Sequence, residues 1–472
     1  MSRPTVLSTP AVAVSWATLP TVLTGVFMTI LDFFIVNVAI PATQRDLHAT
    51  AAQVEWVIAG YGLAYGSGLI LGGRLGDLAG RRRVFTIGLA LFTLASVACG
   101  LAPDAGALIA ARVVQGASAA LLAPQVLAIL RTAYQGAAQL RAINAYALTM
   151  GLAAVFGQLI GGLLIHADLF GLGWRTCFLI NAPIGVAALL LARRVVPESR
   201  GPAGVRLDLG GAVLVTAALV GILLPLIEGR EQGWPWWTWL FFALAGLLLV
   251  AYARRRHEQP LIDPALFRER AFSAGLFTQL AFTMGMAAYF LIFALYAQQG
   301  RGLDALGAGL FFVPLGVGYL AASLAAPRLV ARYGRQVIAA GGLTRAVALA
   351  VLLVAVAGQR PIGWLVPALL VDGIGMGLAL APIMGTVLAR VAPRHAGAAA
   401  GVLTTAQQVG AAVGVGIVGI IYYGSLRNGT TSAFQHGLGY LIVVTAAVAV
   451  LAQLLPRTTP AGGRDRTTTV TR

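Results

Sequence analysis

The sequence predicts an all-α membrane protein whose helices cross the bilayer fourteen times. Of its 472 residues, 58% are hydrophobic and only 10% are charged, and the mean hydropathy is +0.84. This composition suits a lipid environment and not water. Apolar runs of about 20 residues, the length of a membrane-spanning helix, follow one another along the chain. The segments between them are too short to form a soluble domain.

The predicted spans begin near residue 16. The first is too long for a signal peptide, and no basic segment or cleavage site precedes it, so we expect it to be retained as a helix. In order, the fourteen spans lie near residues 16–40, 54–73, 84–102, 105–130, 142–165, 176–193, 209–227, 236–253, 272–298, 306–327, 336–357, 361–389, 397–423 and 433–455.

Arginine placement predicts the orientation of the chain. All 33 basic residues are arginines, and most fall in every second connection, such as Arg81–Arg83 and Arg254–Arg256. Basic connections stay in the cytoplasm, so we expect both termini there. The formal charge of +17 then marks a basic face against anionic lipid and does not indicate nucleic-acid binding. An interfacial aromatic belt is predicted at the opposite end by Trp234, Trp236, Trp237 and Trp239.

The connection after the second span carries a glycine-rich, basic motif, GGRLGDLAGRRRVF, at residues 72–85. Its four glycines permit a sharp turn, and we expect Asp77 to accept backbone N–H groups from a nearby helix start. The motif resembles the loop signature of the major facilitator superfamily. The resemblance implies a conformational latch on the cytoplasmic face, formed by Gly73, Gly76, Asp77, Gly80, Arg81 and Arg82.

Further motifs resemble those of the fourteen-helix drug:proton antiporter subfamily. Trp56 and Tyr61 open the second span as in that subfamily, and a copy of the loop motif without its acid stands at residues 326–335. The other matching segments are LDFFIVNVAIP at 31–41, RVVQG at 112–116, the segment at 174–185 and AGAAAGVLTTAQQVG at 396–410.

This resemblance covers essentially the whole chain and implies the major facilitator fold, with two six-helix bundles related as repeats. The implied parts are an N-terminal bundle at 1–195, a linker with two extra membrane helices at 196–271, a C-terminal bundle at 272–456 and a cytoplasmic tail at 457–472. One departure concerns the fifth span. There Gln158 stands where the subfamily has a proline before two glycines, so the kink attributed to that proline and the direction of transport are open.

Four charged residues lie inside the apolar spans, where a charge costs roughly 2.5–3.5 kcal/mol on insertion scales. We predict that Asp32, the one acid we place inside the spans of the first bundle, carries a proton with Arg112 as its neighbouring cation. A purely structural ion pair is the alternative. Asp372 is predicted as a substrate or proton site, or as a static partner of Arg345, and Arg345 is expected to extend toward the cytoplasmic face.

Polar and aromatic residues at mid-span positions predict a substrate cavity. Hydrogen bonding between helices and ordinary packing are the alternatives for each of them. The predicted cavity residues are Asn37, Tyr61, Gln158, Asn181, Gln279, Tyr289 and Gln407. The histidines lack metal-ligand spacing, and Cys99 and Cys177 fall in or beside apolar spans, so we expect neither a metal site nor a disulfide framework.

Together these features predict proton-coupled efflux of small amphipathic or cationic toxic compounds through alternating access. The expected setting is a bacterial inner membrane, with a monomer that contacts lipid, protons and a small-molecule substrate. Because the chain has no lysine, it has no Walker A phosphate loop, and we expect a proton gradient in place of a cofactor. Alternatives are a dedicated exporter of one metabolite and a proton-coupled uptake symporter. An enzyme would need a nucleophile–base pair or a metal cluster, which the sequence does not suggest.

Overall fold

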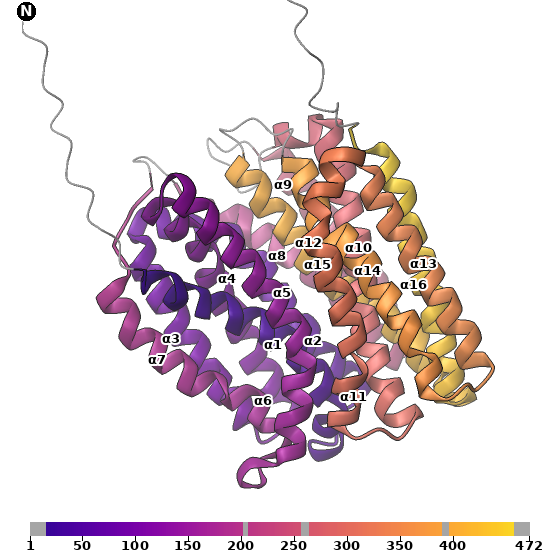
Figure 1. Ribbon diagram of the computed structural model, residues 1–472. Helices are drawn as coiled ribbons and strands as arrows, with labels where there is room; N and C mark the ends of the chain where they lie inside the picture. Colours follow the sequence, from indigo (N-terminus) through magenta and orange to yellow (C-terminus); the bar gives the residue numbers. More distant parts are fainter. Residues whose placement is uncertain (1–15, 202–205, 256–263, 389–395, 457–472) are drawn as a thin grey trace, which may run out of the picture.

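The computed structural model describes residues 16–201, 206–255, 264–388 and 396–456, and all regular secondary structure in these ranges is helical (Figure 1). Thirteen helices of the described chain are long and apolar enough to cross a membrane, and a bent helix brings the number to fourteen. This agrees with the predicted all-α membrane fold. The predicted tail at 457–472 lies outside the described residues.

The helices fall into an early group, a middle pair and a late group along the chain (Figure 1). The early group contains α1 (Thr18–Asp46), α2 (Ala51–Ala79), α3 (Arg81–Gly100), α4 (Ala105–Ala133), α5 (Gly136–Ala167), α6 (Thr176–Leu179) and α7 (Asn181–Val195). The middle pair is α8 (Leu209–Glu231) and α9 (Trp236–Arg254). The late group contains α10 (Arg270–Leu295), α11 (Ala305–Phe311), α12 (Val313–Tyr333), α13 (Gln336–Ala357), α14 (Val366–Leu388), α15 (Ala396–Ser425) and α16 (Thr430–Leu451).

Close backbone contacts repeat in the two groups. In the early group, α2 crosses α4 so closely that a Cβ on Gly116 would lie 2.3 Å from the Tyr61 carbonyl oxygen. In the late group, α12 crosses α14 in the same manner, and a Cβ on Gly373 would lie 2.0 Å from the Leu315 carbonyl oxygen. Glycines at such crossings let membrane helices approach to backbone contact.

The two loop motifs also make corresponding contacts. After α2, Arg82 donates from Nη1 to the Val196 carbonyl oxygen at 3.3 Å, just beyond α7. After α12, Arg335 donates to the carbonyl oxygens of Gln453 and Leu455, just beyond α16. An arginine of the second connection therefore holds the end of the sixth membrane helix in each group, as expected for an internal repeat.

Helix α5 is bent by 44° between Ala154 and Phe156. The bend is present although Gln158 occupies the position of the subfamily's proline. It falls beside Gly157, where a Cβ would lie 2.8 Å from the Phe34 Cβ of α1. Since sharp bends need a local cause, the close packing of this glycine on α1 accounts for the bend without a proline.

The middle pair joins the two groups. Helix α8 packs on both α2 and α15, and α9 packs on α8. Most of α9 faces outward, and Trp236 and Trp239 are exposed near its start, a position typical of aromatic residues at a lipid–water boundary.

Candidate functional site

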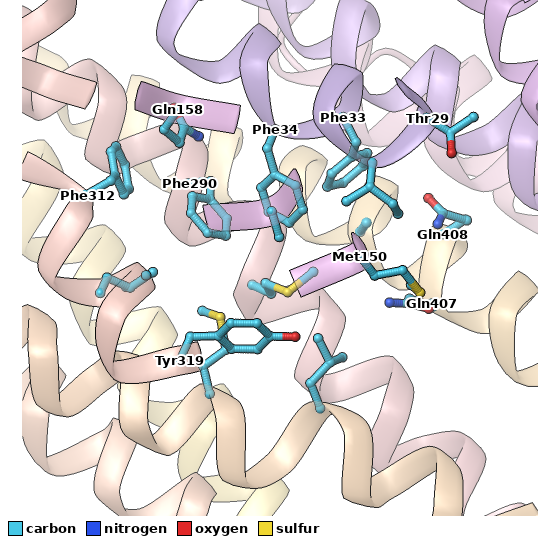
Figure 2. A pocket seen from close by; sticks show the side chains of 18 of the residues that line it. Thr29, Phe33, Phe34, Met150, Gln158, Phe290, Phe312, Tyr319, Gln407 and Gln408 are labelled. Carbon is cyan, nitrogen blue, oxygen red and sulfur yellow. The ribbon is translucent and has the colours of Figure 1, made fainter. Parts of the chain in front are cut away.

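A pocket of about 860 Å³ lies where the early and late groups meet (Figure 2). Helices α1, α2 and α5 contribute to it from the early group, and α10, α12, α14 and α15 from the late group. The labelled lining residues are Thr29, Phe33, Phe34, Met150, Gln158, Phe290, Phe312, Tyr319, Gln407 and Gln408.

The pocket wall is aromatic with a few neutral polar groups. Phe34 and Phe290 meet edge to face with ring centroids 4.9 Å apart, and the Phe290 and Phe312 centroids are 5.5 Å apart. The Tyr319 hydroxyl points into the space between the walls (Figure 2). None of the described residues that line this pocket is charged. Such a wall suits a flat, apolar molecule that carries a few hydrogen-bonding groups.

Two of the seven predicted cavity residues, Gln158 and Gln407, line the pocket. Within the described chain, neither polar atom of the buried Gln158 amide has a hydrogen-bond partner. The other five predicted residues are buried and lie outside this lining: Asn37, Tyr61, Asn181, Gln279 and Tyr289. Asn37, for example, donates to carbonyl oxygens of its own helix, at 3.2 Å from both Phe33 and Phe34.

Asp32 of α1 and Arg112 of α4 form an ion pair in which neither side chain is exposed. Gln115 Nε2 donates to Asp32 Oδ1 at 2.8 Å, and Asn181 Nδ2 donates to the same oxygen at 3.2 Å. The Ser96 hydroxyl accepts from both amides at 2.7 and 3.3 Å. Three donors from α4 and α7 thus bind the carboxylate of α1, and the sequence-based pairing of Asp32 with Arg112 is observed.

Tyr61 connects this cluster with the pocket. The Arg112 guanidinium carbon lies 4.2 Å from the centroid of the Tyr61 ring, a cation–π distance. The Tyr61 hydroxyl donates to the Thr29 carbonyl oxygen at 3.3 Å. Thr29 and Phe33 both line the pocket, and Asp32 lies between them on α1. A displacement of the ion pair would therefore affect the pocket wall by two routes, the Tyr61 ring and the turn of α1 between Thr29 and Phe33.

The late group contains a second buried ion pair. Arg345 Nε of α13 donates to Asp372 Oδ1 of α14 at 2.8 Å, and both side chains are almost fully buried. The expectation that Arg345 extends toward the cytoplasmic face is therefore wrong, because its charge is balanced inside the protein. Asp372 lies one turn before Met376, which lines the pocket. Tyr289 lies beside the pair, with its ring centroid 6.0 Å from the Arg345 guanidinium carbon.

Three buried polar residues with contacts that matter here were not predicted from the sequence: Gln115, Ser96 and Glu55. Gln115 carried a usable signal, because it follows Arg112 by three residues and therefore shares its helix face. Ser96 gave none, as a single serine in an apolar span is common. Glu55 lies at the edge of the predicted second span, where a charge costs little, yet it is fully buried. The statement that Asp32 is the one buried acid of the first bundle is therefore wrong.

The connection between α2 and α3 is fixed by the segment that follows α7. Asp77 Oδ1 accepts from Arg81 Nη2 at 2.9 Å. The backbone N–H groups of Arg82 and Arg83, at the start of α3, donate to the Glu198 carboxylate at 3.0 and 3.2 Å. The expectation that Asp77 binds a helix start is thus corrected for α3, because Glu198 occupies that position.

The glycines of the predicted latch differ in their surroundings. Gly80 has φ +105°, a conformation that a residue with a side chain rarely adopts. A Cβ on Gly76 would lie 1.8 Å from the Gln125 side-chain oxygen, so α2 and α4 touch at this point. Gly73, with Asp77 and Arg81, lines a second hollow at this end of the molecule.

The two ends of the molecule differ in closure. Tyr65 lies in the walls of both the second hollow and the central pocket, so the pocket is approached from the end that carries the α2–α3 connection, here called the loop face. At the opposite face the two groups touch. Gln298 Nε2 donates to the Val38 carbonyl oxygen at 3.0 Å, and His166 pairs with Asp304 at 3.1 Å.

Comparison with known proteins identifies the family of this chain. The chain matches the model of the Major Facilitator Superfamily over residues 22–415. It is 36% identical to the probable actinorhodin transporter of Streptomyces coelicolor over 438 residues, which are 91% of this chain and 76% of that protein. It is 35% identical to the cephamycin export protein of Amycolatopsis lactamdurans, over 93% of each chain.

Solved structures show the same fold. A bacterial homologue of the human lysosomal transporter Spinster, in an inward-facing and occupied conformation, superposes with a TM-score of 0.68 at 16% identity, and the match covers 96% of this chain and all of that chain. With its family match, its relatives and its many apolar helices, this multi-pass membrane protein belongs to the major facilitator superfamily.

Proposed function

We propose that this protein exports small, neutral, amphipathic molecules from a bacterial cell in exchange for protons. The observation that carries the proposal is the uncharged aromatic pocket between the two helix groups, placed one helix turn from the buried Asp32–Arg112 pair. The loop face would be cytoplasmic, with both termini on that side, and the pump would act as a monomer in the inner membrane without a cofactor.

The pocket chemistry supports neutral substrates over cations. Aromatic rings give stacking surface, and the unpartnered Gln158 amide offers a donor and an acceptor to a substrate. A cation would enter without a carboxylate in the described part of the wall, and burying an unpaired charge is costly. Cation–π contacts offset only part of that cost. We therefore narrow the sequence-based class, amphipathic or cationic compounds, to its neutral members.

The proton step would use the Asp32–Arg112 cluster. An ion pair requires an ionised Asp32, so the conformation open to the loop face would correspond to a carrier that has already released its proton. In the opposite conformation, a proton from outside would neutralise Asp32 and loosen its bond to Arg112. Tyr61 and Thr29 would transmit that change to the pocket wall. Coupling results because the substrate binds the two conformations with different affinity.

The relatives support the direction of transport. One is called an export protein and the other a transporter, each for a named compound. These names also favour the second candidate, a dedicated exporter of one compound. Gln158 fits that candidate because a buried amide left unpaired by the wrong substrate gives strong discrimination.

The proposal is tested with everted membrane vesicles in which a proton gradient is imposed. A panel of neutral aromatic compounds and permanently charged aromatic cations of similar size is added, and both uptake and dissipation of the gradient are followed. We expect gradient-dependent uptake of neutral compounds and little uptake of the cations. Preferred transport of the cations would refute the proposed substrate class. A single transported compound would identify a dedicated exporter.

A further inference from the structure

A buried acid outside the central site joins the helix groups at the face opposite the loop. Glu55, in the first turns of α2, is fully buried. Its Oε1 lies 3.1 Å from Arg230 Nη2 at the end of α8. Arg230 Nη1 also donates to the Gly419 carbonyl oxygen of α15 at 2.6 Å. One arginine therefore connects the early group, the middle pair and the late group.

The last turn of α8 makes two more bonds to the start of α2. Glu231 Oε1 accepts from the Ala52 N–H at 2.9 Å, and Glu228 Oε1 accepts from the Trp56 indole N–H at 2.9 Å. This end of α8 thus holds α2 on one side and α15 on the other. The arrangement must separate if the two groups part at this face.

The charges of this cluster are unbalanced. The guanidinium of Arg230 lies near the carboxylates of Glu55 and Glu231, and a third carboxylate, that of Glu228, binds Trp56 in the same turn of α8. Neither oxygen of Glu55 accepts a hydrogen bond of proper geometry within the described chain, and Arg230 is shared with a backbone carbonyl. A buried carboxylate with such incomplete partners is costly. One proton on Glu55 would remove that buried charge and halve the excess negative charge of the cluster.

Within the described residues, no cation other than Arg230 lies at ion-pair distance from Glu55. On α15, the Tyr423 ring centroid lies 4.8 Å from the Arg230 guanidinium carbon. Tyr422, the preceding residue of the same helix, contacts the Tyr423 ring. On α15 the Glu55 carboxylate also fills the space beside Gly419, where a Cβ would lie 2.2 Å from Oε1. On α4, Arg112 binds the Val57 carbonyl oxygen and is already paired with Asp32.

We propose that Glu55 is a second proton-binding site, distinct from Asp32, and that its protonation releases the contact between α2, α8 and α15 at the outer face. This inference rests on the proposed orientation, in which this face is extracellular. A proton from external water would pass the partly exposed Glu228 and Glu231, bind Glu55 and leave its ion pair with Arg230 discharged. Low external pH would then favour opening toward the outside, the conformation in which substrate leaves.

The test measures opening directly in purified protein in nanodiscs, without substrate. Spin labels are placed by Leu101→Cys and Trp364→Cys, two exposed positions at this face, while the native Cys99 and Cys177 are buried. All variants carry Asp32→Asn, so the central acid does not titrate. Distances between the labels are compared between about pH 5.5 and about pH 8.

We expect the population with a long label distance to grow as the pH falls. With Glu55→Gln, which stands for the protonated acid, this population should already be raised about tenfold at high pH, and its pH dependence should be largely lost. Glu228→Gln is the matched control, since its amide oxygen can still accept from Trp56. The His166–Asp304 contact at the same face is present in all these variants, so it does not distinguish them.

Equal distances and equal pH dependence in Glu55→Gln and Glu228→Gln would overturn the proposal. Loss of the fold is checked by thermal unfolding, and Arg230→Gln, which discharges the same pair from its other side, gives a second measurement that should also open this face. The readout needs no transport. It can therefore fail while export holds, and it can succeed if the substrate class proposed above is wrong.

Discussion

The guanidinium carbon of Arg112 lies 4.2 Å from the centroid of the Tyr61 ring, on the side of the ion pair that faces the pocket wall through Thr29. The aromatic ring thus contacts the Asp32–Arg112 pair, and the hydroxyl contacts the backbone of a pocket residue. Tyr61 therefore makes both contacts, and mutation can remove its hydroxyl alone or its hydroxyl together with its ring.

Tyr61→Leu should lower proton-driven transport several-fold, because it removes both the ring and the hydroxyl. The cation–π contact alone is worth about 0.5–2 kcal/mol. Tyr61→Phe retains the ring and should preserve most of the rate. Initial rates of uptake into everted vesicles, at equal protein content, distinguish the variants. Parent-like rates in Tyr61→Leu would show that the ring does not link the cluster to the pocket.

The second ion pair is tested by removing its partners singly and together. Asp372→Asn leaves the Arg345 charge buried without its partner, and breaking a buried pair in this way costs about 3–5 kcal/mol. We expect a clearly lower thermal unfolding temperature in detergent. Arg345→Met combined with Asp372→Asn should recover much of the stability.

Transport by that double variant decides between the two roles left open for Asp372. A stable double variant that transports at the parent rate would identify the pair as a static link between α13 and α14. A stable double variant without transport would assign Asp372 to the substrate or proton pathway. The adjacent pocket residue Met376 makes the second result the one we expect.

The loop face offers a separate test. Asp77 pairs with Arg81 far from the aromatic wall of the pocket, so Asp77→Asn should slow turnover by several-fold with little change in the dissociation constant of the substrate. Glu198→Gln should act in the same direction, since Glu198 holds the start of α3. A large loss of affinity with normal turnover would contradict the assignment of this loop as a latch.

The role of Gln158 is tested by two substitutions, one to alanine and one to proline. Gln158→Ala removes an amide that has no partner within the described residues, so stability should change by less than the roughly 0.6 kcal/mol average of membrane hydrogen bonds. The set of transported compounds should change. Gln158→Pro restores the residue of the resembling subfamily, and the bend of α5 should tolerate it. An unchanged compound profile in both variants would remove Gln158 from the substrate site.

Much of this architecture was predictable because lipid leaves a chain few choices. Apolar runs of bilayer length must be helices, and the loop motif with the Asp32 and Arg112 segments indicated the family. Side-chain partners were harder to predict. From the sequence, Arg345 could extend to the surface or pair with an acid inside the protein. The crossing of α13 and α14, which places Arg345 against Asp372, shows that it is paired inside.

Most residues predicted for the cavity lie outside the pocket lining for a related reason. Mid-span polar residues such as Asn181 and Tyr61 lie at the depth of a cavity, but depth does not say which way a helix faces. Asn181 turns toward Asp32, and Tyr61 turns toward Arg112. The aromatic wall of Phe34, Phe290 and Phe312 was hidden among many similar residues, because apolar side chains carry no signal that separates a pocket from packing.

In the proposed mechanism, Asp32 is the residue that couples protons to substrate movement. Purified parent protein and Asp32→Asn are reconstituted into proteoliposomes with a neutral aromatic substrate, and substrate flux against its own gradient is measured under an imposed proton gradient. We predict that the parent accumulates substrate and that Asp32→Asn, although folded and able to bind it, only equilibrates it. Accumulation by Asp32→Asn equal to that of the parent would contradict the central claim.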